Sequence, residues 1–197
     1  MATQTERRPA AILQAELRNF TRMSEMLDPA KVLELANDFF TLGGRIVREQ
    51  SGKVLSVYND TLLASFAAGA GPDFAADALK AAQDLQREFR LLGERWHTEY
   101  GLPAAVSLGI HLGETVFGMA GPQGAQQYVA FGDPVSIAER LVHRARNGEI
   151  VLSLPVMQAL GTAVSTLGAE ALPPLELAKR QPIAIYGILL EDRLDFT

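Results

Sequence analysis

Two acidic residues stand beside apolar runs, where they could hold a divalent cation. Glu16 lies near the end of the run at residues 9–17, and Asp60 lies between the runs at residues 53–58 and 61–66. If these runs are neighbouring strands, the two carboxylates project side by side from one end of a sheet. Oxygen ligands of this kind suit a hard divalent cation. The pattern therefore predicts a metal site formed by Glu16 and Asp60.

A candidate phosphate-binding loop follows Glu16 directly. Residues 18–21 lead into a predicted helix, and the start of a helix offers free N–H groups to a phosphate. Within this segment, Phe20 is expected to anchor in the core and Thr21 to cap the helix. A metal site beside a phosphate-binding loop indicates nucleotide chemistry.

Hydrophobic periodicity and turn signals predict the elements that must position these residues. Helices are expected at residues 21–26, 29–50, 73–100, 133–147 and 155–160. Strands are expected at residues 9–17, 53–58, 61–66, 104–112, 115–119, 128–131, 150–153, 162–167, 172–177 and 183–190. Turns are expected at Asn59–Asp60 and at Gly113–Glu114, with loops at residues 67–72 and 118–124.

The order of these elements predicts an α+β fold: a ferredoxin-like (split βαβ) mixed sheet with helices packed on one face. Residues 1–8 are expected to form a flexible tail, and residues 9–197 a single domain. Hydrophobic residues make up 48% and charged residues 21% of the 197 residues, which is ordinary for a globular domain.

Charge and composition exclude several classes of function. The net charge of -5 argues against a general binder of nucleic acid or anionic membranes. The chain has no cysteine, so disulfides, thiolate zinc sites and cysteine nucleophiles are excluded. The N-terminus lacks the apolar region of a signal peptide, and no apolar run is long enough to span a bilayer. We therefore expect a cytoplasmic protein.

Five segments together resemble the catalytic domain of class III adenylate and guanylate cyclases, in family order over residues 9–186. They are residues 20–21 after the acidic strand end, 59–66 (NDTLLASF), 109–118 (GIHLGETVFG), 128–135 (YVAFGDPV) with 138–141 (AERL), and 148–153 (GEIVLS). The resemblance implies a homodimer with active sites at its interface. It also implies conversion of a nucleoside triphosphate to a 3′,5′-cyclic nucleotide and pyrophosphate with two Mg²⁺ or Mn²⁺ ions.

The resemblance assigns a role to ten residues of this chain. One chain supplies the metal ligands and its partner the transition-state residues, and a lysine and a second polar residue read the purine. The positions that match are Asp60 and Glu16 for metal; Ser136 and Arg140 for catalysis; Asn19, Phe20, Thr21 and Lys179 for phosphate; and Ser56 and Val129 for the base. For Lys179 and its neighbour Arg180, the alternative of two exposed basic residues in a loop is the favoured interpretation.

Departures from the family pattern lie at several of these positions. Glu16 stands where the family has aspartate, and its extra methylene moves the carboxylate by ~1.5 Å. Asn19 replaces a usual glycine, and asparagine is the residue that best tolerates the same positive φ. Ser136 replaces an asparagine and offers one hydrogen-bond donor in place of two. Loss of a donor aimed at developing charge typically costs ~10²–10³ in rate.

The base-reading positions depart further. Many members of the family carry a lysine where Ser56 stands, and serine cannot reach as far. Val129 has no side-chain hydrogen bond to offer. Ordinary strand packing is the alternative explanation for both residues and is the favoured one for Val129. An unread purine edge lowers both affinity and discrimination.

Three functions therefore remain open on the sequence. The first is a cyclase of weak or impaired activity, with ATP favoured over GTP. The second is a catalytically degenerate cyclase-homology domain that acts as a nucleotide-binding sensor or as a dimerisation and signalling module. The third is a protein-interaction domain without a nucleotide.

Overall fold

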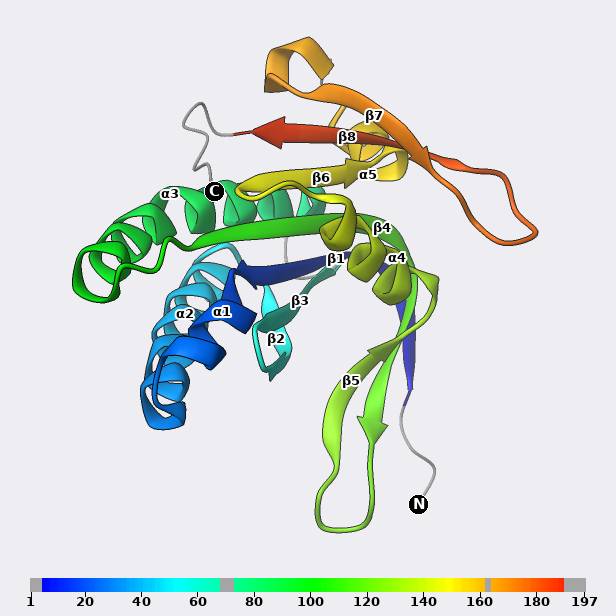
Figure 1. Cartoon of the computed structure of the whole chain (residues 1–197). Coiled ribbons are helices and arrows are strands. Elements are labelled where there is room, and N and C mark those ends of the chain that lie inside the picture. The colour runs from blue at the N-terminus through cyan, green and yellow to red at the C-terminus, as the bar shows by residue number, and fades with distance from the viewer. Residues whose placement is uncertain (1–4, 68–72, 162–163, 190–197) are drawn as a thin grey trace.

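The fold is built on one eight-stranded mixed sheet (Figure 1). The computed structural model describes residues 5–67, 73–161 and 164–189. Within these residues the strands are β1 (Glu6–Arg18), β2 (Lys53–Tyr58), β3 (Thr61–Ala67), β4 (Ala105–Ala120), β5 (Gln127–Phe131), β6 (Glu149–Ser153), β7 (Glu170–Leu175) and β8 (Ile183–Leu189). The helices are α1 (Phe20–Met26), α2 (Pro29–Glu49), α3 (Phe74–Tyr100), α4 (Asp133–Arg144) and α5 (Leu154–Leu160).

The strand order places β1 and β4 at the centre of the sheet. The order is β2-β3-β1-β4-β6-β8-β7, and β5 pairs with the far end of β4. β4 and β6 run parallel, whereas the other neighbours are antiparallel. In Figure 1 the β4–β5 hairpin extends away from the body of the sheet. This α+β architecture is the one that the sequence predicts.

Helices α2 and α3 cover one face of the sheet. Each begins at an aspartate whose carboxylate accepts a hydrogen bond from a backbone N–H in the first turn: Asp28 from Ala30 in α2, and Asp73 from Ala76 in α3. Their apolar sides form the main core with the sheet, where Phe39, Phe89 and Trp96 are fully or almost fully buried. Burial of this apolar surface is the main source of stability for the domain.

Helix α4 lies on the opposite face of the sheet, whereas the sequence predicts helices packed on one face only. A Cβ atom added to Gly109 of β4 would lie 2.5 Å from the carbonyl oxygen of Ala138 and 2.6 Å from the amide nitrogen of Val142. Its neighbours Leu108 and Ile110 instead join the core beneath α3. Since successive side chains of a strand point to opposite faces, α4 and α3 sandwich the sheet.

The predicted turn at Gly113–Glu114 is wrong. β4 runs through these residues without interruption and pairs with β1 from Ala105 to Phe117 in one continuous register. Gly113 is needed for space, because a Cβ there would lie 2.8 Å from Pro134 Cγ at the start of α4. A glycine inside a strand often marks such a close approach and not a turn.

Other differences are local. Glu6–Arg8 already belong to β1, so the strand begins three residues before its predicted start, and residues 1–4 of the predicted tail lie outside the described residues. Of the strand predicted at 162–167, the described part, Val164–Leu167, is a 3₁₀ helix. Most of the loop predicted at 67–72 also lies outside the described residues. None of the described helices has the length and apolar character needed to cross a membrane.

Candidate active site

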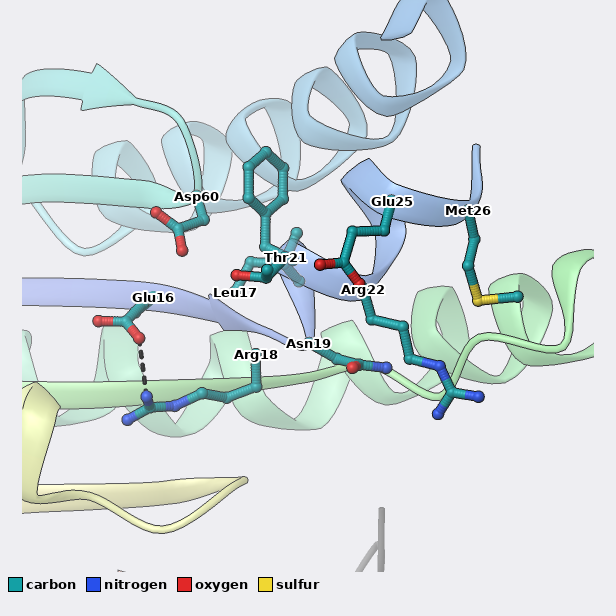
Figure 2. Close-up of a pocket in the computed structure, with 10 residues that line it drawn as sticks. Glu16, Leu17, Arg18, Asn19, Thr21, Arg22, Glu25, Met26 and Asp60 are labelled. Carbon is teal, nitrogen blue, oxygen red and sulfur yellow. Dashed lines mark hydrogen bonds and ion pairs between the residues drawn. The ribbon is translucent and has the colours of Figure 1, made fainter. Parts of the chain in front are cut away.

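The sheet brings Glu16 and Asp60 together, as the sequence predicts. Glu16 of β1 pairs with Thr61 of β3, and the N–H of Leu17 donates a hydrogen bond of 2.8 Å to the carbonyl of Asp60. Asp60 itself follows Asn59, whose φ of 50° forms the tight turn between β2 and β3. The two carboxylates therefore project from adjacent strand ends (Figure 2).

These carboxylates line a cavity of about 570 Å³ beside the start of α1. Figure 2 shows the cavity between the ends of β1 and the β2–β3 turn on one side and α1 on the other. Its walls are formed by Glu16, Leu17, Arg18, Asn19, Phe20, Thr21, Arg22, Glu25, Met26 and Asp60. Five of the ten residues assigned from the sequence thus surround one opening.

The loop before α1 keeps its tight geometry without the usual glycine. Asn19 has φ 70° and ψ 14°, a left-handed conformation. Its side-chain Nδ2 donates to the carbonyl of Pro103 at 2.7 Å, which uses one of the two N–H groups of this amide. Asn19 occupies the N-cap position, so the prediction that Thr21 caps the helix is wrong. Thr21 lies exposed within the first turn.

The backbone at the start of α1 can still meet a phosphate. The first hydrogen bond of the helix runs from the N–H of Met23 to the carbonyl of Asn19. The N–H groups of Phe20 and Thr21 precede it, as is usual in the first turn of a helix. Phe20 packs against the main core, as predicted for an anchor.

Arg18 is tied into the fold around Glu16. Its Nη1 donates to Glu16 Oε1 at 2.7 Å, and its Nε donates to Ser107 Oγ at 2.8 Å. Its Nη2 donates to the carbonyls of Val142 and Ala145 at the C-terminal end of α4. Arg18 is therefore committed to contacts within the chain and is not a free phosphate ligand.

The predicted catalytic residues lie on a separate surface. Ser136 and Arg140 are both exposed and stand four residues apart on α4, so they share one face of that helix. Neither lines the cavity with Asp60. Arg140 Nη2 donates to the carbonyl of Glu176, which follows β7. Within one chain the predicted site is thus divided in two.

The segment between β7 and β8 lies against α4. Lys179 is exposed there and has φ 61°. The guanidinium of Arg180 forms an ion pair with Asp133, at the start of α4. Lys179 is therefore held near the same helix that carries Ser136 and Arg140.

The base-reading positions lie on β2 and β5. Ser56 is exposed, and Val129, which pairs with Gly118 in β4, is half-buried. The neighbouring residues connect the two strands, because Lys53 Nζ lies 3.5 Å from the centre of the Tyr128 ring. This cation–π contact holds β5 beside β2.

His111 is a buried histidine beneath α4. Its Nδ1 lies 2.8 Å from Ser153 Oγ, and the side chain is buried. Burial lowers the pKa of His111 to about 4; nearby Asp133 opposes this shift and Arg180 adds to it. The ring is therefore neutral at pH 7.

The donor set of the cavity fits a divalent cation that also binds substrate phosphates. Mg²⁺ is usually held by one or two carboxylates plus phosphate oxygens and water, and Glu16 and Asp60 supply two such groups. No cluster of three or more histidine, cysteine or acidic side chains suited to a metal occurs among the described residues. A metal here would accordingly rely on the nucleotide for its remaining ligands.

The sequence-based prediction missed three ionisable side chains around the cavity. Arg22 and Glu25 line it from α1, and His143 Nε2 approaches Glu16 Oε2 at 3.5 Å from α4. Helical spacing of one to four residues after Thr21 could have indicated the first two. No signal in the sequence indicates the third, which lies 127 positions after Glu16.

Comparison with known proteins establishes the family. The profile of the adenylate and guanylate cyclase catalytic domain matches residues 3–188. The chain therefore belongs to this family.

Among sequence relatives, an adenylate cyclase of Anabaena cylindrica is 29% identical over 135 residues, which is 68% of this chain. The chain spans only about a quarter of that relative's length (27%).

Solved structures agree on the fold. The adenylyl cyclase CyaB from P. aeruginosa superposes with a TM-score of 0.85 at 20% identity, covering 98% of this chain and all of that one. The guanylyl cyclase Cya2 superposes with a TM-score of 0.82 at 27% identity, covering 92% of each chain. An adenylyl and a guanylyl cyclase thus fit the chain about equally well.

Proposed function

We propose that this chain is a nucleotide cyclase domain of weak activity, which converts ATP in preference to GTP into a 3′,5′-cyclic nucleotide and pyrophosphate. The observation that carries this proposal is the placement of Glu16 and Asp60 on adjacent strand ends, in one cavity with the start of α1. In the reaction the 3′-oxygen of the ribose attacks the α-phosphorus. The bond to the β-phosphate breaks, and the proton of the 3′-hydroxyl is released.

The chain's own groups supply binding and orientation. Asp60 and Glu16 would hold Mg²⁺ or Mn²⁺, which when bound neutralises phosphate charge and activates the 3′-hydroxyl. The backbone N–H groups of Phe20 and Thr21, at the start of α1, would bind the phosphates.

Arg140 can form two parallel hydrogen bonds to phosphate oxygens, and Lys179 can bind a phosphate as a single point charge. Since Arg140 and Asp60 do not share a cavity within one chain, the active site requires two chains, and we propose a homodimer.

A second function is favoured by a separate observation. Ser56, Val129 and Ser136 each weaken an interaction of the family's site, and Glu16 is already paired with Arg18. A domain with these features can bind a nucleotide as a sensor, or dimerise for signalling, without turnover. Both the cyclase and the sensor bind a nucleotide, but only the cyclase forms a cyclic product.

An assay of cyclic nucleotide production from ATP and from GTP distinguishes the cyclase from the sensor. The assay uses Mn²⁺ and a high protein concentration. Cyclic nucleotide that disappears in Asp60→Asn establishes the cyclase. Mn²⁺-dependent nucleotide binding without product, also lost in Asp60→Asn, establishes the sensor. Absence of binding to either nucleotide in the wild-type chain would leave only a protein-interaction role.

A further inference from the structure

We propose that Arg18 is a positioning residue that fixes the Glu16 carboxylate, so that Oε2 is the oxygen presented to a divalent cation. This inference rests on the proposed function, since it concerns the metal site of the same cavity. Arg18 belongs to none of the residues to which the family resemblance gives a role. Its contacts, and not a motif, point to the role.

The first observation is that Arg18 cannot move freely. Besides Glu16, it bonds to three acceptors that belong to other parts of the fold, the hydroxyl of Ser107 and the carbonyls of Val142 and Ala145. Only 19% of its side chain is exposed. The planar guanidinium presents its N–H groups in a fixed fork, and these three acceptors set the orientation of that fork.

The second observation concerns the two oxygens of Glu16. Oε1 accepts from Arg18 Nη1 at 2.7 Å, and 15% of the Glu16 side chain is exposed. Oε2 has His143 Nε2 as a neighbour at 3.5 Å, and the His143 side chain is 58% exposed. The partner of Oε1 is thus fixed by the fold, whereas the neighbour of Oε2 can turn into solvent. Glu16 therefore offers one oxygen to the cavity in a fixed direction.

The third observation decides the sign of the effect. A positive charge beside a metal ligand would ordinarily repel the metal. Here Arg18 Nη2 donates hydrogen bonds to the carbonyls of Val142 and Ala145 at the C-terminal end of α4. This end of a helix carries partial negative charge. This partial charge offsets the repulsion, and the orientation of Glu16 dominates. Removal of a partner that orients a metal ligand typically weakens metal binding by about 10–100-fold.

This arrangement also accounts for glutamate at a position where the family pattern has aspartate. The longer side chain carries its carboxylate to the guanidinium held by Ser107 and α4. Orientation by Arg18 compensates for the added rotational freedom of the longer side chain.

The test measures Mn²⁺ binding to the full chain by electron paramagnetic resonance, with 3′-deoxy-ATP as a nucleotide that cannot cyclise. We expect Arg18→Met to weaken Mn²⁺ binding about tenfold or more. We expect Glu16→Gln to weaken it at least as much, and the double variant to match Glu16→Gln alone, because Arg18 acts through Glu16. Wild-type affinity in Arg18→Met, or additive losses in the double variant, would overturn the proposal.

Two further variants separate positioning from folding. Ser107→Ala removes the partner of Arg18 Nε and the bond from Ser107 to the carbonyl of Arg146. It leaves the Glu16 contact and the two carbonyls of α4 that still orient the guanidinium, so Mn²⁺ affinity should stay near that of the wild type. A loss in Ser107→Ala as large as in Arg18→Met would make Arg18 merely structural. If Arg18→Met does not fold, Arg18→Lys retains the charge without the fork. Weakened Mn²⁺ binding in Arg18→Lys supports the proposal, and wild-type affinity contradicts it.

Asp60→Asn keeps this inference distinct from the proposed function. Mn²⁺ binding that is lost in Asp60→Asn but unchanged in Arg18→Met overturns the role of Arg18 and leaves the metal site in place. A wild-type chain that binds no Mn²⁺ with the nucleotide would overturn both.

Discussion

The side chain of Asn19 donates a hydrogen bond to the carbonyl of Pro103, at 2.7 Å, while its own backbone adopts φ 70°. One residue thus shapes the loop before α1 and ties it to the segment that leads into β4. The bond joins two positions 84 residues apart in the chain. The loop can therefore keep its geometry where the family has glycine.

Substitution of Asn19 tests these two contributions. Asn19→Gly keeps the positive φ and loses the hydrogen bond, so the free energy of unfolding should fall by about 1 kcal/mol. Asn19→Ala loses the bond and also strains the left-handed backbone, which adds about 1–2 kcal/mol. Urea unfolding of the two variants measures the difference. Equal stability of the glycine and alanine variants would contradict the role of the positive φ.

The pH dependence of stability tests the buried histidine. Because His111 has a folded-state pKa of about 4, below its ordinary value of 6.5, the unfolded chain binds the extra proton between these values. His111 therefore contributes stability that is complete above about pH 6.5 and falls as the pH drops toward 4, by about 3 kcal/mol in total.

Comparing the pH dependence of stability of the wild type with that of His111→Asn isolates the contribution of His111. The carboxylates contribute equally to both proteins, so their effect cancels. Urea unfolding at several pH values between 7 and 4 should show a steeper loss for the wild type. Parallel curves for the two proteins would mean that the His111 ring has the same pKa in the folded and the unfolded chain, and would contradict the prediction.

The close approach of α4 to the sheet gives a prediction with a matched control. Gly109→Ala would place a Cβ 2.5 Å from the carbonyl oxygen of Ala138, and the clash is with backbone. We expect a loss of about 1–3 kcal/mol or more in the free energy of unfolding. Gly44→Ala, in the interior of α2, meets only Val54 Cγ2 at 4.0 Å and should gain about 0.5–1 kcal/mol. Thermal unfolding of both variants checks the opposite signs.

The sequence was most informative where a pattern is local. The turn at Asn59–Asp60 and the periodicity of α2 and α3 led to the right elements, and the family resemblance led to the right architecture. The pairing of β1 with β3, which joins Glu16 to Asp60, followed from the same pattern.

Features that depend on contacts between residues far apart in the chain could not be predicted from the sequence. Gly113 looks like a turn residue, and only its contact with Pro134 reveals that it makes room for α4 inside a continuous strand. The four acceptors of Arg18 include a carbonyl 127 positions away. The side of the sheet on which a helix packs is likewise set by tertiary contacts, as at Gly109.

Arg22 offers a test of where the terminal phosphates bind. It lines the cavity from α1, is exposed and, within the described residues, makes no hydrogen bond or ion pair. Figure 2 shows its side chain on the side of the cavity away from Glu16. A charge-assisted bond to phosphate is worth about 1.5–3 kcal/mol, so Arg22→Ala should weaken binding of 3′-deoxy-ATP about tenfold or more.

The matched control removes an equal charge elsewhere. Arg48→Ala, on the exposed side of α2, should leave the affinity unchanged at moderate salt. Adenosine monophosphate should bind Arg22→Ala as well as the wild type, because it lacks the terminal phosphates. A similar loss for the monophosphate would place Arg22 elsewhere than at those phosphates.

Ser136 tests whether the exposed face of α4 meets the reacting phosphate. Asparagine offers two donors where serine offers one, so Ser136→Asn should raise the rate of cyclic nucleotide formation with Mn²⁺ by at least about tenfold, with ~10²–10³ as the upper range for a donor aimed at developing charge. The substitution lies on the exposed side of the helix, and the free energy of unfolding should change little. Ser136→Ala, which has no donor, should be slower than the wild type. If asparagine and alanine at this position gave the same rate, Ser136 would not face the transition state, and the loss of activity would have to arise at Glu16 or at the base-reading positions.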